Sequence, residues 1–191
     1  MKILIINTEM NENSVITAGM EQIRNCLDEQ GIDAELIHLN RDRFERCISC
    51  GKCYKRGRCI YDDEVNEIAE HAQEYDGMIV TASSYYGKLS ERAAAFCERM
   101  FRTSPEIFVR KPACSFIYAR NSMTKDAYDE LNRYYSEANM YVVTSQYYGA
   151  LSEEGILAAM DLYIFLLRKL NGETAEAVFQ PKRRIDYLLG R

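Results

Sequence analysis

The stretch 2-KILIIN-7 is a short apolar run rich in β-branched residues. Such a run without polar alternation is typical of a strand that is buried on both faces of a parallel sheet. The polar segment 8-TEMNENS-14 follows, and 15-VITAGMEQIRNCLDEQ-30 then carries apolar residues at helical spacing, with Gly31 placed to end the helix. The first thirty or so residues therefore predict a strand, a loop and a helix, the repeating unit of a parallel α/β sheet.

The same alternation recurs along the rest of the chain. Further strands are expected at 33–39, 77–83, 112–119 and 140–145, and further helices at 62–76, 90–102, 123–137 and 152–170. Ser90 and Ser152 are expected to cap the helices that follow them. Short apolar strands joined by helical crossovers predict an α/β fold, a flavodoxin-like doubly wound five-stranded parallel sheet in the order 2-1-3-4-5. The cysteine-rich segment is expected as a loop inserted after strand 2.

The size and composition indicate one ordinary globular domain. A chain of 191 residues can bury a substantial core, and we expect the domain to cover residues 1–172, with a cysteine loop at 45–61 and a C-terminal tail at 173–191. The formal net charge of -5 argues against a nucleic-acid binder, whose surface would be basic. The segment 1-MKILIINTEM-10 lacks the pattern of a signal peptide, and no apolar run is long enough to cross a membrane, so a cytoplasmic location is expected.

Four of the seven cysteines lie in 47-CISCGKCYKRGRC-59, with the spacing C-x2-C-x2-C-x5-C. A disulfide framework is disfavoured by the expected cytoplasmic setting and by the odd number of cysteines. Thiolates bind both iron-sulfur clusters and structural zinc. The compact spacing favours a [4Fe–4S] cluster, because zinc ribbons more often use two separated C-x2-C pairs. Zinc and unligated thiols stay open as alternatives. The predicted metal ligands are Cys47, Cys50, Cys53 and Cys59.

The surroundings of these cysteines are basic, which would offset thiolate charge through Lys52, Lys55, Arg56 and Arg58. The remaining cysteines lie within helical or strand patterns and are expected to be small core residues, namely Cys26, Cys97 and Cys114. His38 and His71 have no neighbouring pattern that indicates catalysis, so structural roles are expected for both.

Loops at the carboxyl ends of the strands are the expected ligand site of an open α/β sheet. Two of them resemble each other, 83-SSYYGKLS-90 and 145-SQYYGALS-152. Small hydroxyl residues, a glycine and tyrosine rings suit a flat, partly apolar ligand with a polar edge, although tyrosine is common in this chain. The loop 8–14 offers neutral donors at a helix N-terminus, the usual place for a phosphate, but it contains no glycine and carries Glu9 and Glu12.

The element order, the loop 83–90 and the cysteine run together resemble the flavodoxin-fold NAD(P)H-dependent FMN reductase family, most of all its iron-sulfur flavoprotein branch. Members of that branch carry a compact C-x2-C-x2-C-x(4–7)-C run before a "DD" helix start, which here is Asp62-Asp63. They also have an S-P-x-Y-x-G-type loop after the third strand, matched here by Tyr85 and Gly87, with Ser83 where proline is common. The resemblance covers about residues 1–148. The family's glycines and arginine are missing from the loop after the first strand.

This resemblance implies an FMN-dependent oxidoreductase that passes electrons between the flavin and a [4Fe–4S] cluster and is linked to NAD(P)H or a ferredoxin. It also implies a homodimer or homotetramer in which the two cofactors meet across a subunit interface. The helices at 123–137 and 152–170 are candidates for that surface. The implied phosphate-binding residues are Thr8, Asn11, Asn13 and Ser14. The implied residues around the flavin ring are Ser83, Ser84, Tyr85, Tyr86 and Gly87, with Asn121 and backbone groups of 119–122 on the remaining edge.

No side chain is expected to act as a general acid or base, because the cofactors carry the chemistry. Two alternatives stay open. One is an NAD(P)H-dependent FMN or quinone reductase whose cysteine loop is structural or binds zinc. The other is a redox-sensing or interaction module that has lost FMN and is not an enzyme.

Overall fold

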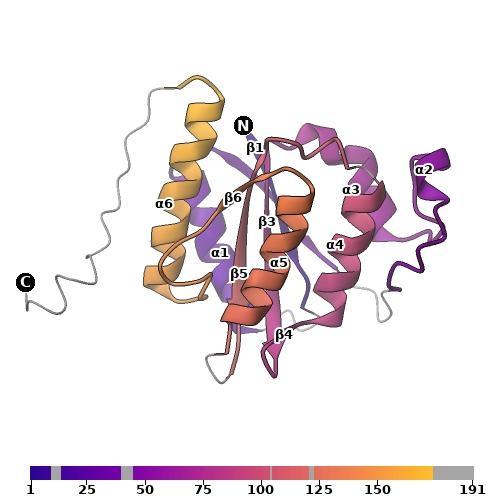
Figure 1. The fold of residues 1–191 in the computed structure, drawn as a ribbon. Helices are drawn as coiled ribbons and strands as arrows, with labels where there is room; N and C mark the ends of the chain where they lie inside the picture. The colour runs from indigo at the N-terminus through magenta and orange to yellow at the C-terminus, as the bar shows by residue number, and fades with distance from the viewer. Residues whose placement is uncertain (10–13, 40–44, 104, 121–122, 174–191) are drawn as a thin grey trace, which may run out of the picture.

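A central sheet of mainly parallel strands organises the computed structural model, which describes residues 1–9, 14–39, 45–103, 105–120 and 123–173 (Figure 1). The parallel strands are β1 (Lys2–Asn7), β2 (Asp33–His38), β3 (Gly77–Tyr85), β5 (Pro112–Tyr118) and β6 (Tyr141–Val143). Their order across the sheet is β2-β1-β3-β5-β6. Counted without β4, this is the predicted order 2-1-3-4-5, so the flavodoxin-like topology is confirmed.

A sixth strand, β4 (Lys88–Leu89), was not predicted. It pairs antiparallel with the end of β3, where Tyr85 lies opposite Lys88. The two residues between them have positive φ angles, 52° at Tyr86 and 79° at Gly87. Positive φ at both central residues is the property of the two-residue turn that matches the twist of a β-hairpin. The loop after β3 is therefore a tight hairpin that projects beyond the sheet.

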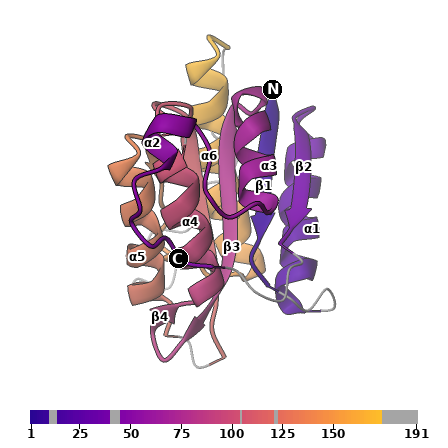
Figure 2. The ribbon, with the colours of Figure 1, turned by 90° about the vertical axis from the view of Figure 1, so that its right-hand side faces the viewer.

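Helices cover both faces of the sheet (Figures 1 and 2). One face carries α1 (Val15–Asp28) and α6 (Glu153–Leu170), and the other carries α3 (Glu64–His71), α4 (Glu91–Thr103) and α5 (Lys125–Glu137). Alternate residues of a strand point to opposite faces. In β1, Ile3 and Ile5 accordingly join the core under α1 and α6, whereas Leu4 and Ile6 join the core under α3, α4 and α5. This two-sided burial is the reason that 2-KILIIN-7 is continuously apolar.

The two predicted serine caps are confirmed, whereas the boundaries of one helix and one strand differ from the prediction. The hydroxyl of Ser152 accepts a hydrogen bond from the Gly155 amide at 3.2 Å, and that of Ser90 accepts one from Ala93 at 3.4 Å. The helix predicted at 62–76 begins later, at Glu64, because Asp63 is its N-cap, and its last turn is a separate 3-10 helix, η1 (Ala72–Glu74). The last strand, β6, is shorter than predicted and ends at Val143.

Cys97 and Cys114 are fully buried in the two cores, and Cys26 is half-buried against the core under α1, as predicted. Burial raises the pKa of the Cys114 thiol to about 12, so this group stays protonated at neutral pH. Nδ1 of His38 lies 2.9 Å from Nδ2 of Asn7, and His71 is an exposed neighbour of Glu74. Within the described ranges, no helix has the length and apolar character needed to cross a membrane.

The cysteine segment lies between β2 and α3 and packs outside the helical layer, beside α4 (Figure 2). It contains one short helix, α2 (Cys53–Arg56), which ends at Gly57 in the left-handed conformation. Its sequence gives it few apolar side chains to bury, which explains why it forms an appendage on the α/β core.

Candidate functional site

The hairpin after β3 forms one wall of an open cleft at the carboxyl ends of β3 and β5. Ser83 and Ser84 are buried at its base, whereas 62% of Tyr85 and 98% of Tyr86 are exposed at its tip. The Ser84 hydroxyl donates a hydrogen bond to the carbonyl of Met123 at 2.8 Å, which joins the hairpin to the segment before α5. The sequence therefore places small polar groups at the base of the cleft and aromatic rings at its rim.

This cleft has a volume of about 490 Å³, within the range of roughly 300–1,000 Å³ found for small-molecule sites. Its described lining residues are Ser83, Ser84, Tyr85, Tyr86, Gly87, Tyr118, Ala119, Arg120 and Met123. All five residues predicted for the flavin ring thus lie together on one cleft. Asn121 falls outside the described residues.

Tyr118 and Met123 line the cleft without having been predicted. Tyr118 is the last residue of β5 and lies opposite Ser83 in the sheet register. The strand pattern alone could have indicated it, because neighbouring parallel strands end at the same edge. None of the described residues of 145–152 lines this cleft, so the second tyrosine loop does not share the position of the first.

The segment between β1 and α1 is where a phosphate was expected. Thr8 is buried, and both its hydroxyl and its amide donate to the carbonyl of Thr81, at 3.0 and 3.2 Å. Ser14 caps α1 by accepting from the Thr17 amide at 3.3 Å. Thr8 therefore ties β1 to β3, and Ser14 orders a helix N-terminus that presents backbone N–H groups. The other two predicted residues, Asn11 and Asn13, lie outside the described residues.

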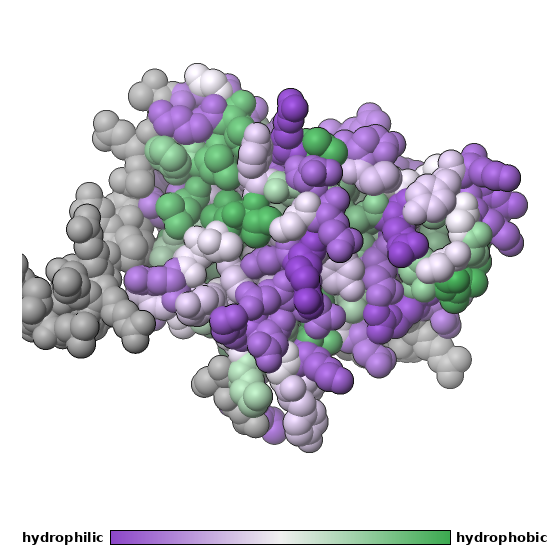
Figure 3. All heavy atoms as spheres, in the orientation of Figure 1, coloured by the Kyte–Doolittle hydropathy of each residue, from purple (hydrophilic) through white to green (hydrophobic). Residues whose placement is uncertain are grey.

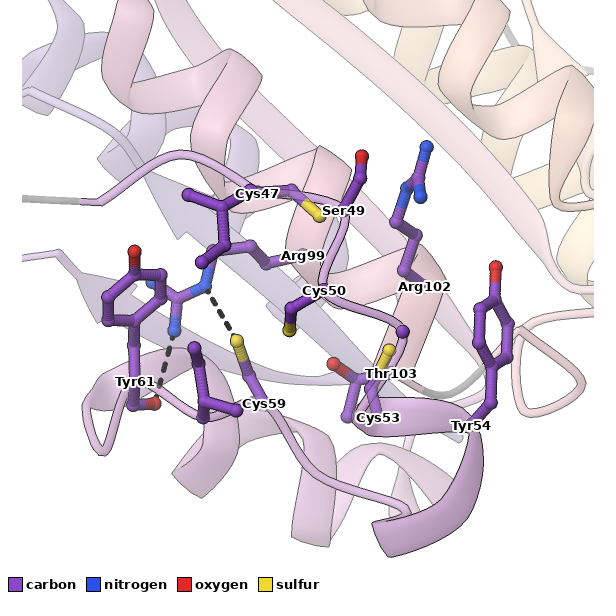
Figure 4. Close-up of a pocket in the computed structure, with 13 residues that line it drawn as sticks. Cys47, Ser49, Cys50, Cys53, Tyr54, Cys59, Tyr61, Arg99, Arg102 and Thr103 are labelled. Carbon is purple, nitrogen blue, oxygen red and sulfur yellow. Dashed lines mark hydrogen bonds between the residues drawn. The ribbon is translucent and has the colours of Figure 1, made fainter.

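The four clustered cysteines line a second, separate pocket (Figure 4). Cys50 is exposed, and the thiols of Cys47, Cys53 and Cys59 are half-buried. The pocket is small, about 20 Å³, and its opposite wall comes from the last two turns of α4. The main chain bends sharply between the cysteines, with Ser49 in the left-handed region at φ 53°. These bends direct side chains of one short segment toward a common space.

The donor chemistry of this pocket fits an iron-sulfur cluster. Four thiols and no carboxylate line it, and thiolates are the usual ligands of such clusters. In the described parts of the chain, no three His, Cys, Asp or Glu side chains are close enough together to hold a single metal ion. In a [4Fe–4S] cluster each thiolate would bind a different iron atom, and in a structural zinc site all four would bind one ion; a set of four thiols is common to both.

One buried cation lies at this pocket, and it was not predicted. The side chain of Arg99, on α4, is fully buried and donates through Nε to Sγ of Cys59 at 3.3 Å. Two further nitrogens donate to the carboxylate of Asp63 at 2.7 and 2.6 Å. Burial opposes the charge on Arg99, but the hydrogen bonds to Asp63 and Cys59 outweigh it and raise the pKa of the guanidinium above its usual range. The side chain is thus a permanent positive charge beside the thiols.

Asn66 fixes the backbone on the same side of the pocket. Its amide nitrogen donates to the carbonyls of Cys59 and Tyr61 at 3.1 and 2.9 Å, and its amide oxygen accepts from the Cys59 N–H at 2.8 Å. The basic residues expected to offset thiolate charge are exposed. Among them, Arg58 forms an ion pair with Asp62 at 2.7 Å. The buried position of Arg99 makes it the stronger electrostatic neighbour of the thiols.

Comparison with known proteins identifies the family of this chain. Residues 1–153 match the family described as NADPH-dependent FMN reductase. The chain belongs to this family. An iron-sulfur flavoprotein of Methanocaldococcus jannaschii is 29% identical over 99 residues, which are 52% of this chain and 51% of that protein. An iron-sulfur flavoprotein of Clostridioides difficile is 26% identical over 148 residues, 76% of this chain and 66% of that protein.

A solved structure of a flavodoxin from the domain Archaea superposes with a TM-score of 0.60 at 16% identity, covering 90% of this chain and 99% of that one. At this identity the superposition shows the common fold. The chain spans about half of the length of the first curated relatives that it matches.

The FMN reductase family resemblance was carried by the cysteine run and the Tyr85–Gly87 loop, and both lie at pockets of the structure. Arg99 was missed because it lies 40 residues after Cys59. Asn66 lies only seven residues after Cys59, but no spacing pattern marks a side chain that binds main-chain groups. A signal for Arg99 was available, since it lies three and four residues after Phe96 and Ala95 on the apolar face of its helix. A charged residue at such a position requires a buried partner.

Proposed function

We propose that this chain is a flavin-dependent oxidoreductase that binds FMN at the carboxyl ends of β3 and β5 and a [4Fe–4S] cluster at the cysteine pocket, and that passes electrons between them. The observation that carries the proposal is the gathering of all four cysteines of the compact run on one pocket in a chain of the FMN reductase family. Bound FMN would supply two-electron chemistry with release of single electrons, and a cluster would accept electrons singly.

The residues of the chain would bind and orient these groups. In the proposal, Ser83 and Ser84 face the polar edge of the flavin ring, and Tyr85 and Tyr86 contact its face. The N-terminus of α1, with Ser14 as its cap, receives the phosphate together with Thr8, Asn11 and Asn13. Asn121 binds the remaining edge of the ring. The cluster ligands are Cys47, Cys50, Cys53 and Cys59. No side chain is assigned as a general acid or base.

The separation of the two sites supports a role for a second subunit. The Ser90 amide donates to the Ser83 carbonyl at 3.1 Å, so α4 begins at the cleft, whereas Arg99 on the same helix lines the cysteine pocket. At about 1.5 Å of rise per residue, the two points lie roughly 14 Å apart along the helix. A homodimer or homotetramer that brings one subunit's cysteine pocket to another's cleft would shorten this path.

An apolar surface for such contact exists on α6. Leu157, Leu162 and Leu170 are exposed there, and Figure 3 shows hydrophobic residues gathered over this helix. Contiguous exposed apolar surface is typical of subunit contacts. The oligomer is part of the proposal, and its size is measured by light scattering of the FMN-loaded protein.

The proposal is tested by anaerobic reduction of the protein loaded with FMN, iron and sulfide. NADH, NADPH and a reduced ferredoxin are added in separate experiments, and bleaching of the flavin and cluster absorbance is followed. Reduction of both absorbances by one donor is the expected result. Reduction of flavin alone, in protein that holds zinc or no metal, would favour an FMN or quinone reductase. Failure to bind FMN at all would leave only the non-enzymatic alternative.

Tyr86→Asn separates the conformational role of this residue from its contact with a ligand. Tyr86 has a φ of 52° and is almost fully exposed, so asparagine, which tolerates this conformation, is expected to stabilise the apoprotein. The gain should be about 0.5–1 kcal/mol, measured by denaturant unfolding. The loss of the ring should weaken FMN binding about fivefold to tenfold, measured by flavin fluorescence titration.

Tyr141→Asn is the control for FMN binding, because Tyr141 is also partly exposed and begins β6 opposite Pro112, at the amino ends of the strands and away from the cleft. It should leave the dissociation constant of FMN unchanged. An unchanged FMN affinity in Tyr86→Asn would show that the hairpin tip does not contact the flavin.

A further inference from the structure

Arg99 occupies an unusual position for a guanidinium, since its side chain is fully buried between α4, the start of α3 and the cysteine segment. Transfer of an unpaired guanidinium from water to such a site would be strongly unfavourable. The chain compensates with specific partners. The carboxylate of Asp63 binds two nitrogens side by side, the arrangement that best matches the planar fork of arginine.

Further contacts of Arg99 are made to the cysteine loop. Nε donates to Sγ of Cys59 at 3.3 Å, and the other nitrogens donate to the carbonyls of Glu45 and Tyr61, each at 3.3 Å. The guanidinium carbon also lies 5.1 Å from the centre of the Tyr61 ring. Figure 4 shows the Arg99 side chain reaching from its helix to the sulfur of Cys59 and to the main chain at Tyr61. One side chain thus fixes a predicted ligand and the backbone that follows it.

We infer that Arg99 is a positioning residue that sets the reduction potential of the cluster, by donating its Nε–H to the sulfur of Cys59 and holding a positive charge beside it. This inference rests on the proposed function, because it requires the cluster at the cysteine pocket. Reduction adds one electron and makes the cluster more negative. A nearby positive charge and a hydrogen bond to a ligand sulfur both stabilise the more negative state. Arg99 therefore raises the potential, and the negative charge of the Asp63 carboxylate, which pairs with Arg99, partly offsets this effect.

A purely structural role is the competing explanation, since the Arg99–Asp63 pair also joins α4 to the start of α3. The sign of the shift in reduction potential separates the structural explanation from the proposed one. Arg99→Met removes the positive charge and the N–H donor, so the potential should fall. Asp63→Asn removes the negative charge and keeps the guanidinium, so the potential should rise. Both changes break the same ion pair and should lower the thermal stability of the apoprotein.

The test is a spectroscopic redox titration of the unaltered protein and these two variants, each loaded anaerobically with iron and sulfide. Arg99→Met should shift the reduced-to-oxidised ratio at a fixed potential about tenfold toward the oxidised form, which is about 59 mV for a one-electron couple. Asp63→Asn should shift it in the opposite direction. Unchanged potentials, or shifts of the same sign in both variants, would overturn the inference.

Arg99→Lys covers the case in which Arg99→Met fails to hold a cluster. It keeps the charge but lacks the Nε–H that donates to Cys59, so its potential should fall by a smaller amount. Loss of the cluster from both Arg99 variants, with retention in Asp63→Asn, would support positioning of Cys59. Loss from all three would assign Arg99 to structure alone. If the unaltered protein takes up no iron and sulfide, the proposed function itself fails, and this outcome is distinct from unchanged potentials.

Discussion

Cys53→Ser is expected to remove the broad visible absorbance of the cluster while leaving the flavin bands in place. Serine oxygen is a poor replacement for a soft thiolate at iron, and Cys53 is the central residue of the compact run. The iron bound after anaerobic loading should fall from about four atoms per chain to less than one. Iron and sulfide analysis, together with the visible spectrum, measures the change.

Cys26→Ser is the control for this experiment. Cys26 is a half-buried thiol on α1, and it does not line the cysteine pocket. The iron content and spectrum of the Cys26→Ser variant should equal those of the unaltered protein. Full iron binding in Cys53→Ser, or an equal loss in both variants, would contradict the assignment of the ligands.

Gly149→Ala is expected to cause a large loss of stability at a position outside the two sites. Gly149 has a φ of 67°, and an added Cβ would lie 2.5 Å from ring carbons of Tyr128 and 2.6 Å from the carbonyl oxygen of Ser115. The Gly149 carbonyl also accepts from the Ile117 amide at 2.7 Å, so the backbone cannot move away without losing its bond to β5. The loss should be about 3 kcal/mol or more in the free energy of unfolding.

Gly31→Ala is the matched control, since Gly31 has a similar φ of 69° but no heavy atom within 4 Å of an added Cβ. Only the conformational cost of the left-handed region applies there, about 1 kcal/mol. Urea unfolding of both variants gives the comparison. Equal losses at the two positions would show that the close approach of Gly149 to β5 and α5 does not exist in solution.

Most of the fold could be predicted from the sequence, because strands such as 2-KILIIN-7 are buried on both faces and therefore have no polar alternation. The hairpin with β4 could not, because its pairing depends on the positive φ of Tyr86, a residue type that seldom adopts that conformation. The ends of α3 were also misjudged, since Asp63 serves as a cap where the acidic run suggested the helix interior.

The candidate site was predictable where its residues are close in sequence. The hairpin residues and the four cysteines each come from one segment, so their spacing carried the information. Arg99 comes from α4 and meets the cysteine loop only through tertiary packing. Asp63 and Asn66 follow the loop closely, but their contacts with Arg99 and with the main chain at Cys59 do not show in the spacing. The loop at 8–14 gave a poor phosphate motif, and the bond by which Thr8 ties β1 to β3 could not be read from it.

The central claim is that one chain of the FMN reductase family binds two redox cofactors. It is tested most directly by purifying the unaltered protein anaerobically, supplying FMN, iron and sulfide, and removing what does not bind. The account predicts paired flavin bands together with a broad brown absorbance that dithionite bleaches, with about four iron atoms and about four sulfides per chain. Flavin bands with zinc, or with no metal and no sulfide, would contradict it.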